Sequence, residues 1–324
     1  MRARNAPETH QLRTRCGCEE ELQIRTTLGL STRAFGILQI LLSGVCFGFL
    51  GIFGKTAYQH GLTPGELLSL RFFTAGCLVL GFLGLFQRHR LLRMQRHEVL
   101  WSIVLGALGY AVFSGLYFLA LTGLSASLTV LLLYLYPVMV PIGAWVFLGE
   151  RIPRDKWFVL PMAMVGLVLL VAGELYVSNV GAFAYGVAAA FFYSIYILCS
   201  SRFLAGADAV ASAGIMQFSA GLTLALLSWR SPERFISVVS DLWLLVLAMA
   251  FVCSIMAMTL FLAGLQKLKN WEVSVLSTAE PVTGIAIAFL FLHESLSLQQ
   301  LLGGSLVLSA FVALAWPKRQ YRNH

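Results

Sequence analysis

The chain has 324 residues, of which 58% are hydrophobic and 12% are charged. A soluble globular protein carries about 25% charged residues, so this composition excludes an ordinary water-soluble domain and indicates a protein whose solvent is the lipid bilayer. The formal net charge of +8 does not indicate a nucleic-acid partner, because nearly all Lys and Arg residues lie in short segments between apolar runs, where they act as topology signals.

Residues 1–34 form a polar arm in which a run of Glu residues stands beside several Arg residues. The arm lacks the apolar stretch of a secretory signal, and its acidic residues are untypical of a transit peptide. Its Cys16 and Cys18 have no second pair of ligands, and the other Cys residues lie inside apolar runs at no regular spacing. We therefore expect a cytoplasmic tail, and no metal or cofactor anywhere in the chain.

Ten apolar runs follow, each close to the length of about 20 residues that a helix needs to cross the hydrocarbon core. They are residues 35–57, 64–86, 100–122, 126–148, 157–172, 181–203, 209–228, 242–265, 272–293 and 299–316. The fifth run is the shortest. Strands of a membrane barrel would be about ten residues long and alternating, so these longer runs predict an all-α integral membrane protein with ten transmembrane helices.

The charges of the connections predict the orientation. Counted from a cytoplasmic N-terminus, the even-numbered connections and the C-terminus hold thirteen Lys and Arg residues, whereas the odd-numbered connections hold only Arg230 and Arg234. Cytoplasmic loops are enriched in Lys and Arg, so the bias predicts a multi-pass protein of the plasma membrane, the inner membrane of a bacterium, with both termini in the cytoplasm. The short connections leave no room for a soluble domain.

The chain repeats itself at a spacing of about 144 residues. Tyr136-Pro-Val is followed by Phe-Leu-Gly-Glu ending at Glu150, and Glu280-Pro-Val is followed by Phe-Leu-His-Glu ending at Glu294. The earlier helices align near a shift of 145. This pattern predicts two five-helix halves, residues 35–172 and 181–316, before a basic cytoplasmic tail at residues 317–324. Because five is odd, the second half enters the membrane from the opposite side, an inverted repeat typical of secondary transporters.

Paired halves that each close with Pro…Phe-Leu-x-Glu before a last helix resemble the EamA-type families of the drug/metabolite transporter superfamily. Residues 48–55, followed by Gly61-Leu-Thr-Pro and Arg71-Phe, are similar to the first hairpin of these families. The resemblance covers residues 35–316, with one departure at His293, where the first half has Gly149. It implies ten helices around a central cavity, with the fifth and tenth at the periphery, and export or exchange of metabolites, amino acids or drugs.

Glu280 is an acidic residue roughly 12 Å from the inner edge of the membrane, as estimated from the helix rise. A carboxylate at that depth usually faces a cavity or a partner, so Glu280 is either a substrate or proton site or a structural carboxylate. Ser277 shares its helix face. Tyr136, its repeat-mate, reaches a similar depth from the opposite side. Pro137 and Pro281 are expected to bend the two helices.

Two basic residues lie within the runs, apart from Arg202 at the edge of the sixth run. Lys55 shares a face with a stripe of Gly residues near the outer end of the first helix, and it either snorkels to water or points into protein. Arg71 lies deeper in the second helix, with Glu66 one turn before it, and is expected to belong to a structural or gating ion pair. Glu150 and Glu294 end two runs at opposite surfaces and are expected to be interfacial caps or gate residues.

Two polar stripes are candidates for the wall of a cavity. Tyr110, Ser114 and Tyr117 share one face of the third helix, and Tyr193, Tyr196 and Ser200 share one face of the sixth. Their rings could stack on an aromatic substrate or surround a cation. The alternative for each stripe is hydrogen bonding between helices.

We expect a secondary transporter that carries a small metabolite by alternating access, with export of an amino acid, amine or drug-like compound as the first interpretation. The alternatives are a sugar or nucleotide-sugar exchanger of the same superfamily, a channel and a non-transporting membrane protein. The sequence has no Walker A pattern and no motif of an intramembrane enzyme, so neither ATP drive nor catalysis is expected. The expected partners are the bilayer, the substrate and H⁺ as coupling ion, while direction and homodimer formation stay open.

Overall fold

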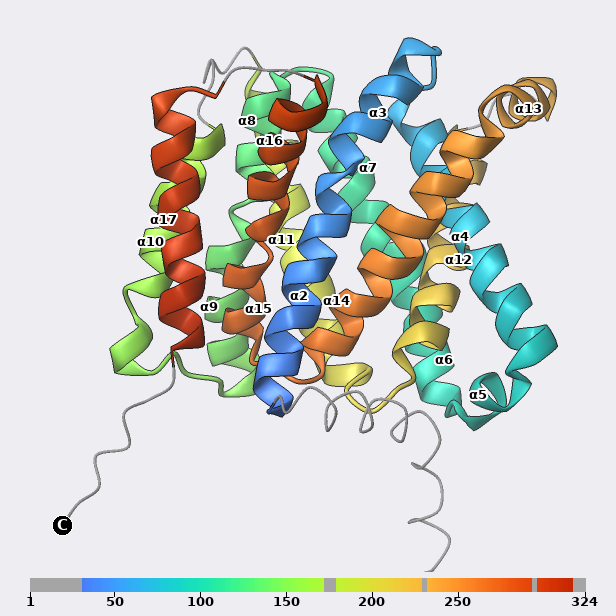
Figure 1. Ribbon diagram of the computed structural model, residues 1–324. Helices are drawn as coiled ribbons and strands as arrows, with labels where there is room; N and C mark the ends of the chain where they lie inside the picture. Colours follow the sequence, from blue (N-terminus) through green and yellow to red (C-terminus); the bar gives the residue numbers. More distant parts are fainter. Residues whose placement is uncertain (1–30, 172–178, 229–231, 293–295, 317–324) are drawn as a thin grey trace, which may run out of the picture.

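The computed structural model describes residues 31–171, 179–228, 232–292 and 296–316. In this part of the chain all regular elements are helices (Figure 1), as the apolar runs predict. Nine helical segments of the described residues are long and apolar enough to cross a membrane. The N-terminal tail, the C-terminal tail, His293 and Glu294 lie outside the described residues.

The first half contains α2 (Thr32–Gly48), α3 (Leu50–Gln59), α4 (Pro64–Phe86), α5 (Arg88–Arg93), α6 (Arg96–Val104), η1 (Leu105–Tyr110), α7 (Ala111–Leu121), α8 (Ala126–Leu133), α9 (Tyr136–Leu148), η2 (Arg154–Lys156) and α10 (Val159–Val171). The second half contains α11 (Val180–Phe203), α12 (Ala209–Ser228), α13 (Pro232–Met249), η3 (Ala250–Met256), α14 (Ala257–Leu265), α15 (Asn270–Leu276), α16 (Ala279–Leu292) and α17 (Leu298–Ala315). The segments η1 and η3 are π-helical and continue directly into α7 and α14.

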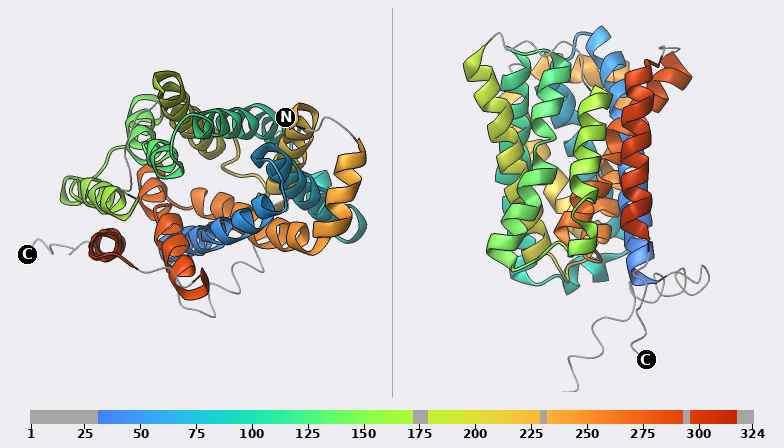
Figure 2. Two further views of the ribbon diagram at one scale, coloured as in Figure 1. Left: turned by 90° about the horizontal axis from the view of Figure 1, so that it is seen from above. Right: turned by 90° about the vertical axis from the view of Figure 1, so that its left-hand side faces the viewer.

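The predicted fifth span is α10, whose 13 residues fall short of the spanning length that the other nine reach. It still leads from the face where α9 ends to the face where α11 begins (Figure 1). At one end of the molecule α10 packs against α17 (Figure 2). This is the peripheral position that the family resemblance implies for the fifth and tenth helices.

We call the face where α2 begins the basal face and the opposite one the distal face. Figure 1 shows that α17 ends at the basal face, and that the connections α4–α6, α9–α10, α11–α12 and α14–α15 also lie there. These are the even-numbered, Lys- and Arg-rich connections, so the basic loops gather on one face as the charge count predicts. The second half starts at the distal face, and its helices therefore run opposite to those of the first.

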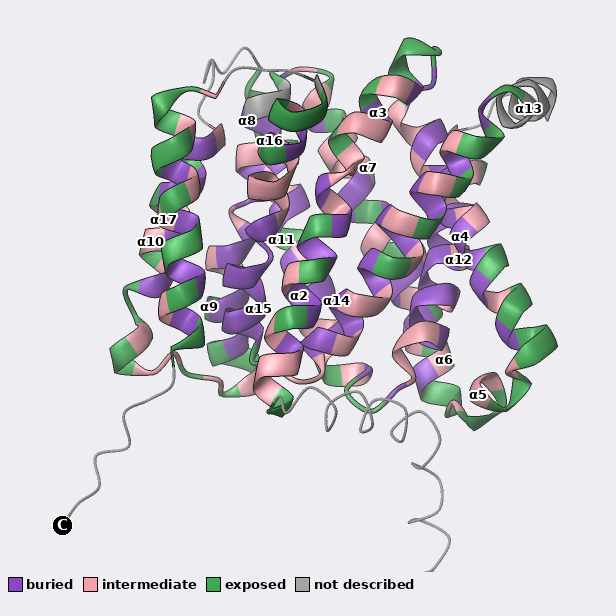
Figure 3. Cartoon of the chain, viewed as in Figure 1, coloured by how far each residue is buried: buried purple, intermediate pink, exposed green. Residues whose placement is uncertain are grey.

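Many large apolar side chains lie exposed on the outside of the bundle (Figure 3). On α4, for example, Phe82, Leu85 and Phe86 are 51%, 81% and 74% exposed. A contiguous apolar surface of this kind would be unstable in water, whereas lipid covers it without cost. The structure thus agrees with the membrane setting that the composition predicts.

The fourth helix of each half is interrupted near the middle of the bundle. In the first half α8 ends at Leu133 and α9 restarts at Tyr136, directly before Pro137. In the second half α15 ends at Leu276 and α16 restarts at Ala279, two residues before Pro281. Proline has no N–H and its ring clashes with the preceding turn, so a break at this point is its expected effect. Two half-helix N-termini consequently lie inside the molecule.

One connection differs from the prediction. The sequence leaves residues 229–241 between two spans, but α13 begins at Pro232 and reaches Met249, with non-helical dihedral angles at Leu242. The segment before Leu242 is thus a helix that turns across the distal face before the membrane-crossing part begins (Figure 1).

Polar contacts join the two halves at the basal face. They pair Arg33 with Glu272 (2.7 Å), Arg90 with Asp208 (2.8 Å), Glu150 with Asn270 (2.9 Å) and Lys156 with the carbonyl of Trp316 (3.1 Å). Beside them the rings of Trp101 and Phe203 stack with centroids 3.8 Å apart. The basal side of the molecule is therefore closed by contacts between elements from both halves.

Candidate functional site

A cavity of about 490 Å³ lies inside the bundle and reaches the distal face. Lys55 and Tyr58, near the end of α3, line its mouth, and Tyr58 is 46% exposed. Eight residues singled out from the sequence line it: Lys55, Arg71, Tyr110, Ser114, Tyr117, Tyr136, Tyr193 and Glu280. Residues from both halves thus share one space that opens away from the closed basal face.

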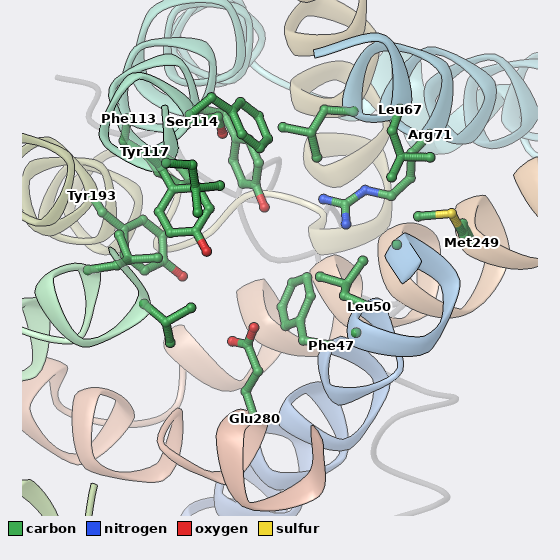
Figure 4. A pocket seen from close by; sticks show the side chains of 18 of the residues that line it. Phe47, Leu50, Leu67, Arg71, Phe113, Ser114, Tyr117, Tyr193, Met249 and Glu280 are labelled. Atoms are coloured by element: carbon green, nitrogen blue, oxygen red, sulfur yellow. The ribbon is translucent and has the colours of Figure 1, made fainter. Parts of the chain in front are cut away.

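Glu280 and Arg71 carry opposite charges on different walls of this cavity. The Glu280 carboxyl points inward from the start of α16, and the Arg71 guanidinium points inward from α4 (Figure 4). The hydroxyls of Tyr117 and Tyr193 also point into the space between these walls (Figure 4). A small molecule with a positive and a negative group could therefore meet a complementary charge at each end.

Arg71 is 3% exposed, and its guanidinium carbon lies 4.2 Å from the centroid of the Phe72 ring. Its buried Nε has no hydrogen-bond partner among the described residues. Glu66, one turn before Arg71, accepts a hydrogen bond from the backbone N–H of Thr63 and completes the cap of α4. A buried donor left without a partner is costly, so Arg71 is suited to receive an acceptor from a substrate.

Aromatic rings form a continuous wall between Arg71 and Glu280. The centroid distances are 4.7 Å for Tyr110–Phe113, 4.5 Å for Phe113–Tyr193 and 4.7 Å for Tyr193–Tyr136. Rings at these spacings support one another and expose edges and faces to the cavity. The wall can stack on a planar group or stabilise an ammonium group through its π-electrons.

The two helix breaks supply polar groups near the middle of the bundle. Glu280 lies in the first turn of α16, where the partial positive charge of a helix N-terminus favours a carboxylate. Tyr134, between α8 and α9, lies close enough to donate a hydrogen bond to Glu280. Sequence reasoning missed Tyr134, although its place two residues before Tyr136 in a proline-broken helix was a usable signal. Phe113 and Phe118 were missed because they are apolar.

Two predicted site residues lie outside this cavity. Tyr196 is 1% exposed, and its hydroxyl contacts the Sδ of Met258 at 3.6 Å. Ser277 donates its hydroxyl hydrogen to the carbonyl of Val273 and, with Glu280, lines a separate void of only about 10 Å³. The stripe of Tyr193, Tyr196 and Ser200 therefore enters the cavity only at Tyr193 and continues below its floor.

The glycine stripe of the first helix packs as a close helix contact. A Cβ at Gly44 would lie 2.9 Å from the Cβ of Ala279, and one at Gly48 would lie 2.7 Å from the Cβ of Thr283. Side chains at these positions would push α16 away from α2. The stripe thus seats Glu280 against the first half, while Lys55 lies further along at the cavity mouth.

Comparison with protein families decides the class of the molecule. The EamA-like transporter family matches residues 34–172 and again residues 181–316. The chain belongs to the EamA-like transporter family. It is therefore a multi-pass membrane transporter of the drug/metabolite superfamily that the sequence motifs resemble, and two copies of the family's repeat make up its hydrophobic part.

Relatives of this chain match over most of its length. A protein of Archaeoglobus fulgidus named an uncharacterized transporter is 26% identical over 87% of this chain and 96% of its own. The inner membrane transporter YicL of Salmonella typhimurium, also named uncharacterized, is 24% identical over 90% and 98%. A probable amino-acid metabolite efflux pump of Salmonella typhimurium is 25% identical over 86% and 93%.

The fold has a solved counterpart. One crystal structure superimposes with a TM-score of 0.71 at 21% sequence identity, over 86% of this chain and 96% of the other. The likeness extends over both halves, so the arrangement of helices around the cavity is that of a known fold.

Proposed function

We propose that this EamA transporter exports a small metabolite, an amino acid or an amine, across the inner membrane by alternating access. The observation that carries the proposal is the pair of Glu280 and Arg71, which face one cavity from different walls, with the hydroxyls of Tyr117 and Tyr193 pointing into the same space (Figure 4). An α-amino acid presents an ammonium group and a carboxylate at once. It can offer a counter-charge to both side chains, whereas a neutral sugar offers a counter-charge to neither.

The roles follow from the chemistry of each wall. The Glu280 carboxylate receives the ammonium group, and the tyrosine rings beside it stabilise the same charge. The Arg71 guanidinium donates to the substrate carboxylate, with the fork of parallel N–H groups that favours planar oxyanions. The efflux-pump name of one relative supports an amino-acid substrate and an outward direction.

In this proposal the basal face is cytoplasmic, because the basic connections lie there. The cavity then opens to the outside in the present conformation. Glu280 also serves as the proton site, since a proton and an ammonium group compete for the same carboxylate. Inward movement of a proton would drive release of the substrate to the outside.

The test uses the purified protein in proteoliposomes and three related compounds. L-phenylalanine carries both charged groups, phenethylamine lacks the carboxylate, and 3-phenylpropionate lacks the ammonium group. We expect saturable uptake and counterflow of phenylalanine, weaker transport of the amine and none of the acid. Flux that rises linearly with concentration and shows no counterflow would indicate a channel instead.

A second measurement tests proton coupling. Glu280→Gln should abolish stimulation of transport by a pH gradient, and Glu280→Asp, which keeps the charge, should retain part of it. If Glu280→Gln left both the rate and its pH dependence unchanged, the assignment of Glu280 would be wrong.

A further inference from the structure

The chain consists of two similar halves, and the cavity opens at only one face of the molecule. The cavity-lining residues of α4 and α7, in the first half, have equivalent residues in the second half. Residues 71–76 of α4 align with residues 216–221 of α12 at a shift of 145, which pairs Phe73 with Phe218 and Gly76 with Gly221. The C-terminal part of the third helix aligns at a shift of 144, so that α7 and α14 end at equivalent residues. These shifts assign an equivalent residue in the second half, its counterpart, to each lining residue of α4 and α7.

The counterparts are buried and lie at the basal side of the molecule. On α4, Leu67, Leu68 and Arg71 line the cavity, and their counterparts on α12 are Ser212, Ala213 and Met216. On α7, Ser114, Tyr117 and Phe118 line it, and their counterparts on α14 are Met258, Phe261 and Leu262. None of the six counterparts is more than 4% exposed, and none lines the cavity. On the outer wall Leu67, Arg71 and Ser114 are equally buried, whereas Leu68, Tyr117 and Phe118 are partly exposed. A wall that lines open space in one half thus corresponds to a packed seam in the other.

Tyr196 separates the cavity from this seam. Its ring lies 5.5 Å from that of Tyr110 and 5.8 Å from that of Tyr193, both of which line the cavity. Its hydroxyl contacts Met258 on the other side. Tyr196 therefore lies between two rings of the cavity wall and one residue of the seam, and we call its position the floor of the cavity.

The packing of the broken helices shows the same asymmetry. At the basal side α9 packs against α15, and Glu150 accepts hydrogen bonds from the backbone N–H and the side-chain amide of Asn270 at 3.0 and 2.9 Å. Their equivalents at the distal side, α16 and α8, make no comparable contact among the described residues. One side of the pseudo-symmetric molecule is therefore packed where the other is open.

Buried polar atoms of α12, the helix that contributes Ser212, Ala213 and Met216 to the seam, lack hydrogen-bond partners among the described residues. The hydroxyl of Ser212, like both amide atoms of Gln217 on the same helix, is buried without a hydrogen bond in the described part of the chain. Such groups are rare in a permanently dry interior, and a surface that meets water in another state explains them.

We propose that the six residues Ser212, Ala213, Met216, Met258, Phe261 and Leu262 form an inner vestibule, closed in this conformation, through which substrate enters from the cytoplasm. The inference rests on the alternating access proposed above. Opening requires Tyr196 to leave the floor and Glu150 to leave Asn270. The inner vestibule is uncharged, because Met216 stands where the outer wall has Arg71. A zwitterionic substrate therefore meets a partner for its carboxylate only on the outer side.

The test measures which side reaches matched positions. In a background without native Cys, Phe118→Cys reports the outer wall and its counterpart Leu262→Cys reports the inner vestibule. Each is treated with a membrane-impermeant maleimide from one side of oriented vesicles. We expect Phe118→Cys to react from the outside and Leu262→Cys from the cytoplasmic side only.

The equilibrium is then shifted with Glu150→Gln, which leaves one acceptor oxygen for the two donors of Asn270 and turns an NH2 group against the other donor. We expect cytoplasmic labelling of Leu262→Cys to quicken about tenfold, since hydrogen bonds to charged groups are strong, and outer labelling of Phe118→Cys to slow. Met216→Cys replaces Leu262→Cys if that variant does not fold.

A correctly folded, transporting protein in which neither Leu262→Cys nor Met216→Cys reacts from the cytoplasmic side would overturn the vestibule and leave the transport proposal intact. Conversely, inner labelling in a protein that moves neither phenylalanine nor phenethylamine would support the vestibule and reject the proposed substrates.

Discussion

The rings of Phe73 and Phe218 stack with centroids 5.4 Å apart, and the two residues occupy equivalent positions in the two halves. Contact between equivalent residues marks the axis that relates the halves. The glycines one turn further on pack reciprocally there, Gly76 against Phe218 and Gly221 against Phe73. A contact on the axis looks the same when the halves exchange roles, so α4 and α12 belong to the part of the molecule that both states share.

This shared contact predicts a selective loss of stability. A Cβ at position 76 would lie 2.5 Å from the Cα of Phe218, so Gly76→Ala should destabilise the protein by about 1–3 kcal/mol through overpacking. The matched control is Gly84→Ala on the same helix, where a Cβ meets no atom within 4 Å. The control should be neutral or slightly stabilising, because alanine favours a helix. Thermal unfolding in detergent measures the stability of both variants. Equal unfolding midpoints for Gly76→Ala and Gly84→Ala would contradict the close packing at Gly76.

Arg71 should discriminate substrates by their carboxylate. Hydrogen bonds to charged groups contribute about 1.5–3 kcal/mol, so Arg71→Gln should raise the KM for phenylalanine roughly 10- to 100-fold. The KM for phenethylamine should change little, because that ligand has no carboxylate to lose. Arg71→Lys keeps the charge but not the planar fork of N–H groups, so its KM for phenylalanine should lie between those of the unchanged protein and Arg71→Gln. A similar rise for both ligands would point to a structural role.

Tyr193 should contribute through its ring. It connects Phe113 with Tyr136 in the aromatic wall, at centroid distances of 4.5 and 4.7 Å. Tyr193→Leu should therefore weaken transport of phenylalanine by about two- to tenfold, the range expected for an aromatic pair of 0.5–1.5 kcal/mol. Tyr193→Phe should retain the ring contribution. Transport of phenylalanine is measured for both variants. A lower rate for Tyr193→Phe than for Tyr193→Leu would contradict this account.

The orientation predicts where reporters will be found. A tag after residue 316 should be protected in intact cells, and a tag inserted at the Gly61 turn, between α3 and α4 at the distal face, should be accessible from outside. The Gly61 backbone has a φ of 77°, so the tag must follow rather than replace it. An external C-terminal tag would reverse the orientation and the proposed direction of transport.

Much of the architecture was predictable because lipid imposes simple rules. Apolar length located the helices, the Lys and Arg count assigned the loops to faces, and the repeated proline motif located Tyr136 and Glu280 at the helix breaks. The shortness of α10 was also visible. The helix before Leu242 was not, because a helix lying across the face needs no long apolar run.

The extent of the cavity could not be predicted from one helix at a time. A helical wheel shows that Tyr193, Tyr196 and Ser200 share a face, but Met258 from another helix determines where the open space ends. The π-helical segments η1 and η3 also leave no plain mark in composition.

The polar contacts that close the basal face have a pharmacological consequence. With the orientation proposed above, the resting carrier presents its charged, tyrosine-lined cavity to the exterior. A polar blocker of suitable length could then occupy the carrier without ever entering the cell, and it would be selected by affinity alone rather than by permeability.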